Sequence, residues 1–182
     1  NFDALKKVIG YVPQSDIVYD NLTLHDMLMY TARLRLPADT GREDREAAIS
    51  RAMDMVELTE KKNSLIRALS GGQKKLVSIA DVLIMEPEII IFDEPMAALD
   101  PVNTDRIREI LEQLTAEGKT IVLSTHDVDF AFEWADRIAV FSDGNLIQTG
   151  TPKEVFANRA VLEQGNLKMP AVLQIFQSLC AQ

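Results

Sequence analysis

Residues 88–95 read Glu-Ile-Ile-Ile-Phe-Asp-Glu-Pro, an apolar run that ends in two adjacent carboxylates. The run Glu88–Phe92 is typical of a buried strand, and Pro95 places Asp93 and Glu94 on the loop that follows it. Open α/β sheets bind their ligands at the carboxyl ends of their strands. In phosphoryl transfer, one such carboxylate can hold Mg²⁺ and its neighbour can orient or deprotonate the attacking water. Taken alone, adjacent acids after a strand are more often a solvated turn.

The sequence on both sides of this strand predicts further strands that alternate with helices. Strands are expected at Lys7–Val12, Thr120–Ser124 and Arg137–Phe141. Helices are expected at Thr23 to about Leu36, Glu43–Leu58, Ser70 to about Met85, Asn103–Glu117 and Asp127–Ala135. This alternation predicts right-handed crossovers and a mostly parallel sheet, hence an α/β core. Residues 142–145 predict a hairpin turn into a strand at Leu146–Thr149, and short helices are expected after Pro152.

Residues 69–73, Leu-Ser-Gly-Gly-Gln, open one of the expected helices. Gly71 and Gly72 allow backbone N–H groups to approach an anion, and the Ser70 hydroxyl adds a donor. The helix dipole favours negative charge at the same place. By itself, Ser-Gly-Gly before a helix is more often a plain N-cap than a phosphate site.

Three more polar residues stand where strands end or helices begin. Gln14 follows the first expected strand, Asp100 precedes Pro101 at the start of a helix, and His126 follows the apolar run Ile121–Thr125. Each has an ordinary structural interpretation: a loop residue, a helix-start aspartate and a satisfied histidine. Because parallel strands end at the same edge of a sheet, Gln14 and His126 are expected beside the two carboxylates.

In this order, the motifs resemble the ABC ATPase family. The match comprises the Q-loop glutamine at Gln14, the signature motif at Leu69–Gln73, the Walker B strand at Ile89–Asp93, the catalytic glutamate at Glu94, the D-loop at Ala97–Asp100 and the H-loop histidine at His126. It extends to about Val155. The resemblance implies a P-loop NTPase-like ABC cassette core with an inserted helical subdomain.

The resemblance also implies that two cassettes pair head to tail, as a homo- or heterodimer, around ATP and Mg²⁺. Ser70, Gly71, Gly72 and Gln73 would belong to the signature that faces the nucleotide of the partner subunit. Asp100, in the D-loop, would belong to the same nucleotide-binding set.

Within its own subunit, the resemblance implies four roles around the metal and the terminal phosphate. Asp93 would hold Mg²⁺ through water, and Glu94 would activate the attacking water. His126 would stabilise the γ-phosphate. Gln14 would sense the metal and couple to transmembrane transporter subunits through the helical segment Asn21–Met85.

This family pattern divides the chain into four parts. Residues 1–20 would end the catalytic core at the Q-loop, and residues 21–85 would form the helical signature subdomain. Residues 86–150 would return to the core, and residues 151–182 would form a helical tail.

No G-x-x-x-x-G-K-[ST] phosphate loop occurs in the sequence. Gly118-Lys119-Thr120 imitates its end, but it lies between an expected helix and the next strand, the reverse of the order that the motif requires. We therefore expect a cassette truncated at its N-terminus, as a fragment or as half of a split or fused protein. Such a chain is expected neither to bind nor to hydrolyse ATP alone.

Composition excludes several other classes of protein. A net charge of −9 disfavours a general nucleic-acid binder, so no nucleic-acid partner is expected. The single cysteine, Cys180, cannot form an internal disulfide, and no Cys/His cluster has zinc spacing. No apolar run approaches the ~18–20 residues that span a bilayer, and no secretory signal is present at the start. A cytoplasmic protein, peripheral on the inner face of the membrane through its partners, is expected.

Two parts of the chain resemble different transporter subgroups. The segments Ser124–Phe130, Glu133–Arg137 and Gly150–Phe156 resemble ATPase subunits of cobalt, nickel and vitamin importers of the energy-coupling type. The front, from Gly10–Gln14 through Leu34–Pro37, is more similar to exporter-type or ABC-2-type cassettes. We favour the importer, with the exporter or ABC-2 type as an alternative and a hybrid or chimera of the two as another.

A non-transport ABC ATPase and a catalytically inactive regulatory module are further alternatives. Two departures from the family bear on activity. Leu76 stands where most relatives carry a basic residue, and Met96 where they carry Thr or Ser.

Overall fold

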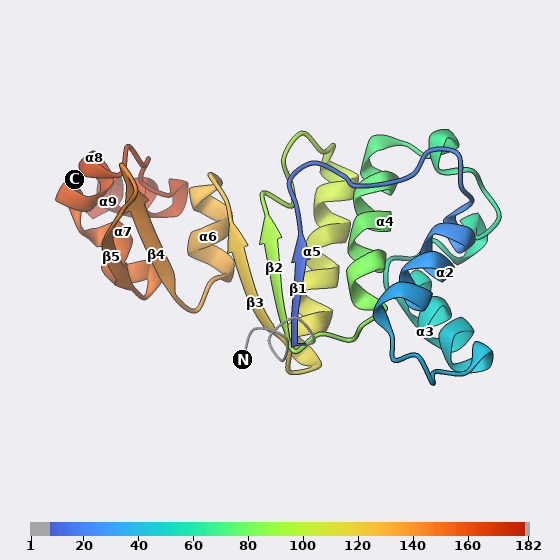
Figure 1. Ribbon diagram of the computed structural model, residues 1–182. Helices are drawn as coiled ribbons and strands as arrows, with labels where there is room; N and C mark the ends of the chain where they lie inside the picture. Colours follow the sequence, from blue (N-terminus) through green and yellow to red (C-terminus); the bar gives the residue numbers. More distant parts are fainter. Residues whose placement is uncertain (1–7, 181–182) are drawn as a thin grey trace. The chain divides into compact units, whose positions relative to one another are not determined.

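The computed structural model describes residues 8–180, which form two compact units that divide between Ser124 and Thr125 (Figure 1). Lys7, the expected first residue of the first strand, and the side chain of Cys180 lie outside what is described. Each unit is treated by itself below. In the part of the chain that is described, no helix has the length and apolarity needed to cross a bilayer.

The first unit is built on a three-stranded parallel sheet in the order β1-β2-β3. The strands are β1 (Ile9–Val12), β2 (Ile89–Asp93) and β3 (Thr120–Ser124). Their ends are level, because Val12 pairs with Phe92 and Asp93 pairs with Ser124. The parallel sheet and the α/β core predicted from the sequence are confirmed.

One face of this sheet is covered and the other is open. Ile90 and Phe92 are fully buried, whereas Tyr11 and Val122 are half exposed. Helix α4 (Gly71–Leu83) packs against β1, and α5 (Pro101–Ala116) packs against β3. Asp93 therefore shares the open face with Tyr11, since side chains alternate along a strand.

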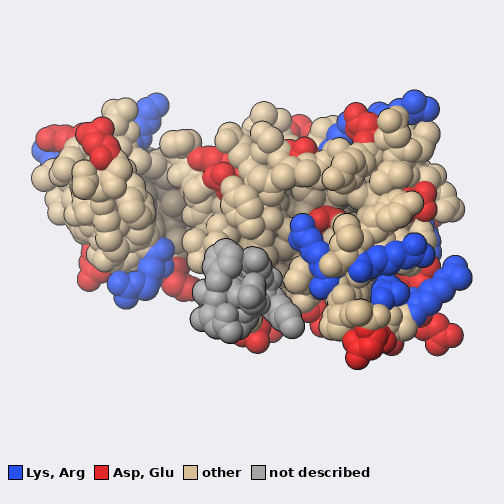
Figure 2. Space-filling view, in the orientation of Figure 1, with Lys and Arg blue, Asp and Glu red and all other residues tan. Residues whose placement is uncertain are grey.

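A helical segment connects β1 to α4. It consists of α2 (Leu24–Arg35), α3 (Arg42–Met55) and two 3₁₀ turns at Thr59–Lys61 and Ile66–Ala68. Thr23 caps α2, because its Oγ1 accepts a hydrogen bond from Asp26 N at 3.1 Å. Leu24, Leu28, Ile49 and Met53 are buried where α2, α3 and α4 pack together. Lys and Arg side chains gather on the surface of this segment (Figure 2).

The second unit contains a hairpin and short helices. The hairpin strands are β4 (Ile138–Ser142) and β5 (Asn145–Gly150), and the helices are α6 (Val128–Trp134), α7 (Pro152–Ala157), α8 (Arg159–Gln164) and α9 (Ala171–Cys180). Val140, Val155 and Val161 form its core. The predicted turn at residues 142–145 is confirmed, with positive φ at Asp143 and Gly144.

One expectation about the sheet was wrong. The strand at residues 137–141 was expected to extend the parallel sheet, but among the described residues β4 pairs only with β5, in an antiparallel two-stranded sheet. A two-residue turn joins β4 directly to β5, and so short a connection permits only antiparallel pairing between these two strands. The alternation of strands and helices, which suggested a parallel neighbour for β4, does not specify which strands pair.

Candidate functional site

Asp93, Ser124 and Tyr11 form a hydrogen-bonded group, the Asp93 group, that spans all three strands of the parallel sheet. Ser124 donates from Oγ to Asp93 Oδ1 at 2.6 Å. Tyr11 donates from its phenol to Asp93 Oδ2 at 3.1 Å. Both carboxylate oxygens are thus oriented at the ends of the strands. The placement of Gln14 and His126 beside Asp93, expected from the sequence, stays a prediction.

The same hydrogen bond changes the acidity of Tyr11. It is the largest cause that raises the pKa of the Tyr11 phenol, with smaller contributions from burial and from the charge of Asp93. Ionisation would remove the donated hydrogen and place a phenolate beside a carboxylate. The pKa of Tyr11 therefore reports on the position of Asp93.

Glu94 begins a tight turn immediately after the strand. Its N–H donates to the carbonyl oxygen (3.2 Å) and to Oγ (3.1 Å) of Ser124. Its φ is 45°, in the left-handed region, and Ala98 in the same turn has φ 58°. Non-glycine residues adopt this conformation at a cost of about 1 kcal/mol or more, and such residues gather at functional sites. Glu94 therefore lies in a turn that is held to β3, directly after Asp93.

The segment Ser70–Gln73 forms a complete capping box at the start of α4. Ser70 Oγ accepts from Gln73 N (3.3 Å), and the Gln73 side chain accepts from Ser70 N (3.1 Å). The two glycines have different surroundings. A Cβ on Gly71 would meet nothing within 4 Å, whereas a Cβ on Gly72 would lie 2.3 Å from side-chain atoms of Asn103.

Asp100 is the N-cap of α5 and lies close to the same place. Its carboxylate accepts from Asn103 N at 3.0 Å and from Asn103 Nδ2 at 2.5 Å. The hydrogen bonds from Asn103, that of its backbone N–H first, hold the pKa of Asp100 below its ordinary value. Since Asn103 also packs on Gly72, the starts of α4 and α5 are neighbours. The helix-start interpretation of Asp100 fits these bonds, and its contact with nucleotide stays a prediction.

Gln14 lies in the loop after β1, with an exposed side chain and an anchored backbone. The carbonyl oxygens of Pro13 and Gln14 both accept from Lys75 Nζ, at 2.8 Å and 2.9 Å. Lys75 belongs to α4, and only 4% of its side chain is exposed. Burial is the largest influence on the pKa of Lys75 and lowers it, although the carboxylates of Asp16 and Asp93 act in the opposite direction.

His126 belongs to the second unit and is exposed, two residues beyond the end of β3. Asp127 follows it and caps α6 by accepting from Phe130 N at 2.9 Å. The role of His126 beside Asp93 and Glu94 stays a prediction.

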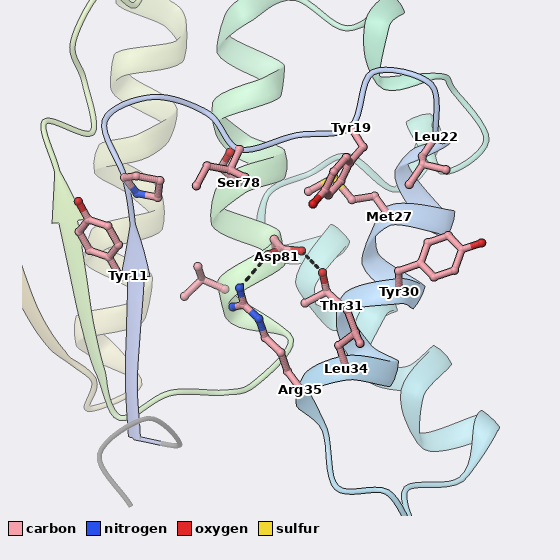
Figure 3. Close-up of a pocket in the computed structure, with 13 residues that line it drawn as sticks. Tyr11, Tyr19, Leu22, Met27, Tyr30, Thr31, Leu34, Arg35, Ser78 and Asp81 are labelled. Atoms are coloured by element: carbon pink, nitrogen blue, oxygen red, sulfur yellow. Dashed lines mark hydrogen bonds and ion pairs between the residues drawn. The ribbon is translucent and has the colours of Figure 1, made fainter. Parts of the chain in front are cut away.

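A groove of about 410 Å³ opens between the loop after β1, α2 and α4 (Figure 3). Its lining includes apolar side chains that are largely exposed: Ile17, Tyr19, Tyr30 and Leu34. Asp81 of α4 also lines the groove, accepts a hydrogen bond from the Thr31 hydroxyl and lies 3.9 Å from Arg35. Burial is the largest influence on the pKa of Asp81 and raises it.

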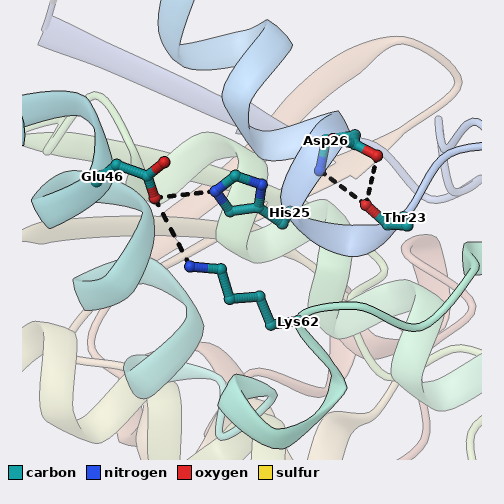
Figure 4. A network of polar contacts seen from close by, with 5 residues as sticks. All are labelled: Thr23, His25, Asp26, Glu46 and Lys62. Atoms are coloured by element: carbon teal, nitrogen blue, oxygen red, sulfur yellow. Dashed lines mark hydrogen bonds and ion pairs between the residues drawn. The ribbon is translucent and has the colours of Figure 1, made fainter. Parts of the chain in front are cut away.

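A polar network joins α2 to α3 and to Lys62 (Figure 4). Glu46 of α3 accepts a hydrogen bond from His25 Nε2 at 2.9 Å and lies 3.7 Å from Lys62 Nζ. The bond from His25 is the main cause that lowers the pKa of Glu46. Backbone bonds from Leu24 N to Ser64 O and from His25 N to Lys62 O, both 3.0 Å, add to it.

Comparison with known proteins assigns the family. Residues 1–97 match the model of the ABC transporter family, which is more than half of the 182 residues. The chain belongs to the ABC transporter family. The resemblance to the ABC ATPase family is thereby confirmed, and the solved structure described below confirms the cassette fold.

Relatives within the family carry related names. The energy-coupling factor transporter ATP-binding protein EcfA of Methanocaldococcus jannaschii is 37% identical over 177 residues, or 96% of this chain and 62% of that protein. The protein of the same name from Carboxydothermus hydrogenoformans is 38% identical over 97% of this chain and 64% of its own length. The chain therefore spans less than two thirds of these curated relatives.

A solved structure agrees with the sequence relatives. The structure of cbiO1 from Clostridium perfringens, described as part of the ABC transporter complex cbiONQ, is similar with a TM-score of 0.76 and 31% identity. The match covers 96% of this chain and 69% of that one.

As an ABC cassette, the chain offers oxygen donors of the kind that Mg²⁺ prefers, but few of them. Residues 8–180 contain no group of three or more His, Cys, Asp or Glu side chains able to hold a metal ion. Asp93 would supply one carboxylate, and Mg²⁺ usually completes its coordination with water and substrate phosphates. The donor set therefore fits a metal that arrives with a nucleotide.

Sequence reasoning missed four residues that support the motifs: Tyr11, Lys75, Asn103 and Ser124. Ser124 could have been found, because parallel strands that end level place it beside Asp93. Lys75 carried a signal too, as a charged residue among the apolar positions of α4. Tyr11 and Asn103 depend on which strands and helices become neighbours, which no local pattern encodes.

The first prediction concerns the Asp93 group. In a pH titration followed by phenolate absorbance, Tyr11 should ionise above the ordinary value of about 10. Asp93→Ala should lower its pKa toward that value, and Tyr11→Phe should identify the signal among the three tyrosines. Ser124→Ala, which removes the other bond to Asp93, should leave the pKa of Tyr11 raised. An unchanged pKa in Asp93→Ala would contradict the geometry.

The second prediction separates the two signature glycines. Gly72→Ala should lower the free energy of unfolding by about 1–3 kcal/mol, because Asn103 is held by Asp100 and cannot move away without losing those bonds. Gly71→Ala should change it by no more than about 0.5 kcal/mol. Urea denaturation measures both. Adding Asn103→Ala to Gly72→Ala should restore part of the loss, and equal effects of the two glycine substitutions would refute the assignment.

Proposed function

We propose that this chain is part of the ATP-hydrolysing subunit of an ABC importer of the energy-coupling type, with cobalt, nickel or a vitamin as cargo. The observation that carries the proposal is the Asp93 group: an oriented carboxylate at the end of a central strand, with Glu94 in a strained turn directly after it. The names of the relatives, which match along 96–97% of the chain, support the importer over the exporter alternative.

In this proposal, the chain's own residues divide the work. Asp93 holds the hydrated metal, with its two oxygens oriented by Tyr11 and Ser124. Glu94 accepts the proton of the attacking water, which is the role of a general base. When bound, ATP would supply the electrophilic phosphorus, and Mg²⁺ would neutralise charge on its phosphate oxygens.

The signature acts toward a second subunit. The Ser70 hydroxyl and the unobstructed backbone at Gly71 offer donors at a helix N-terminus, where anions are favoured. Gln73 keeps Ser70 in place through the capping box, and Asp100 and Asn103 hold Gly72 beside α5. In the proposed head-to-tail dimer, this surface contacts the γ-phosphate of the ATP bound by the partner subunit, while His126 contacts the γ-phosphate within its own subunit.

The groove between α2 and α4 is the proposed docking place of a transmembrane subunit, at the cytoplasmic face of the membrane. Large exposed apolar side chains grouped in a hollow mark interaction sites, and a short helix fits such a groove. The loop of Gln14 forms one wall, so that an occupant would lie beside the proposed metal sensor.

The third prediction tests catalysis. These 182 residues contain no phosphate loop, so the chain alone should not hydrolyse ATP, and ATP affinity in the micromolar to millimolar range would contradict this. With the Walker A segment of the Methanocaldococcus jannaschii relative fused before residue 1, it should hydrolyse Mg-ATP. In that fusion, Glu94→Gln should lower kcat by about 10²–10⁴-fold with ATP binding retained. Equal kcat values would remove Glu94 from the proposed role.

The fourth prediction tests the docking groove. Leu34→Glu should weaken binding to the membrane subunits of an energy-coupling transporter about tenfold or more, because it places a charge in an apolar contact. Leu146→Glu, at another exposed leucine in the second unit, is the control and should bind normally. Co-purification in detergent measures both, and equal binding by Leu34→Glu and the unmodified chain would exclude the groove.

A further inference from the structure

Lys75 is the most deeply buried charged side chain among the described residues. Its Nζ donates to the carbonyl oxygens of Pro13 (2.8 Å) and Gln14 (2.9 Å) and lies 3.8 Å from Asp16 Oδ1. Ser78, one turn later on α4, donates to the same Asp16 oxygen at 3.4 Å. A buried ammonium group is costly unless such partners compensate for the lost water.

The two carbonyl groups that accept hydrogen bonds from Lys75 lie on either side of the α-carbon of Gln14. The Pro13 carbonyl belongs to the peptide group before Gln14, and the Gln14 carbonyl belongs to the peptide group after it. Both peptide planes that meet at the α-carbon of Gln14 are therefore anchored to one ammonium group. The two soft backbone torsions of Gln14 lie between these planes, so anchoring both restricts the direction of its Cα–Cβ bond.

Lys75 also connects the loop to the signature. It lies on the second turn of α4, five residues after Ser70 and three after Gly72, and a helix is rigid over that distance. We propose that Lys75 is a positioning residue. It holds the backbone of Gln14 in a fixed direction and joins the loop of Gln14 rigidly to the start of α4. An effect of this positioning on ATP hydrolysis rests on the proposed function, whereas the order of the loop at Gln14 does not.

The neighbouring residue provides a matched control. Lys74 Nζ forms an ion pair with Asp20 Oδ1 at 2.7 Å, and 26% of its side chain is exposed. It joins α4 to the same connecting segment without touching the peptide groups of Gln14. Loss of Lys74 should therefore leave the loop at Gln14 ordered.

The test is a measurement of backbone amide order parameters by NMR in the 182-residue chain. In the unmodified chain, Gln14 and Ser15 should be near the value of about 0.85 for rigid backbone, and in Lys75→Met they should fall below about 0.6. Amides of α4 and β2 should not change. Lys75→Arg, which keeps a charged donor, should restore much of the order, and Lys74→Met should match the unmodified chain.

Three results would overturn the proposal: a mobile Gln14 in the unmodified chain, an unchanged Gln14 in Lys75→Met, or equal loss of order in Lys74→Met. The first of these needs no variant, so it decides even if Lys75→Met does not fold. In the Walker A fusion, Lys75→Met should lower kcat about tenfold with little change in KM. If the unmodified fusion is inactive, the proposed function fails. The order parameters still test whether Lys75 positions Gln14.

Discussion

The parallel register of β2 with β3 is the constraint on which the candidate site depends. Asp93 pairs with Ser124, so the hydroxyl that orients the carboxylate and the backbone that receives Glu94 N–H both come from one residue. The register is set by the buried face, where Ile90 and Phe92 are inaccessible to water. A slip of one residue would turn these side chains toward the open face and Asp93 toward the core. Burial of Ile90 and Phe92 on one face of the sheet thus fixes the position of the Asp93 carboxylate on the other face.

Local patterns predicted the elements well, because each has a cause close by in the sequence. The apolar run before Asp93 gave a strand, Ser70 gave a capped helix, and residues 142–145 gave a hairpin turn. Asp100, whose interpretation as a helix-start residue required only its neighbours, caps α5 as expected.

What the sequence could not provide is the order in which elements become neighbours. The bond from Tyr11 to Asp93 joins residues 82 positions apart and exists because β1 lies beside β2. The packing of Asn103 on Gly72 needs the starts of α4 and α5 to meet. The strand at 137–141 was expected in the parallel sheet but pairs with β5. It shows the same limit, because alternation of strands and helices does not specify which strands pair.

Helix α4 connects the capping box, the loop of Gln14 and the groove. Ser70 and Gly71 stand at its start, Lys75 and Ser78 hold the loop of Gln14 on its second and third turns, and Asp81 lines the groove near its end. Its residues from Lys75 to Ala80 are all buried, so the helix is held on several sides. A rigid helix is one of the elements that can carry coupling between distant sites. In the proposed function, α4 is therefore the element through which an occupant of the groove would act on the loop of Gln14 and on the start of the helix.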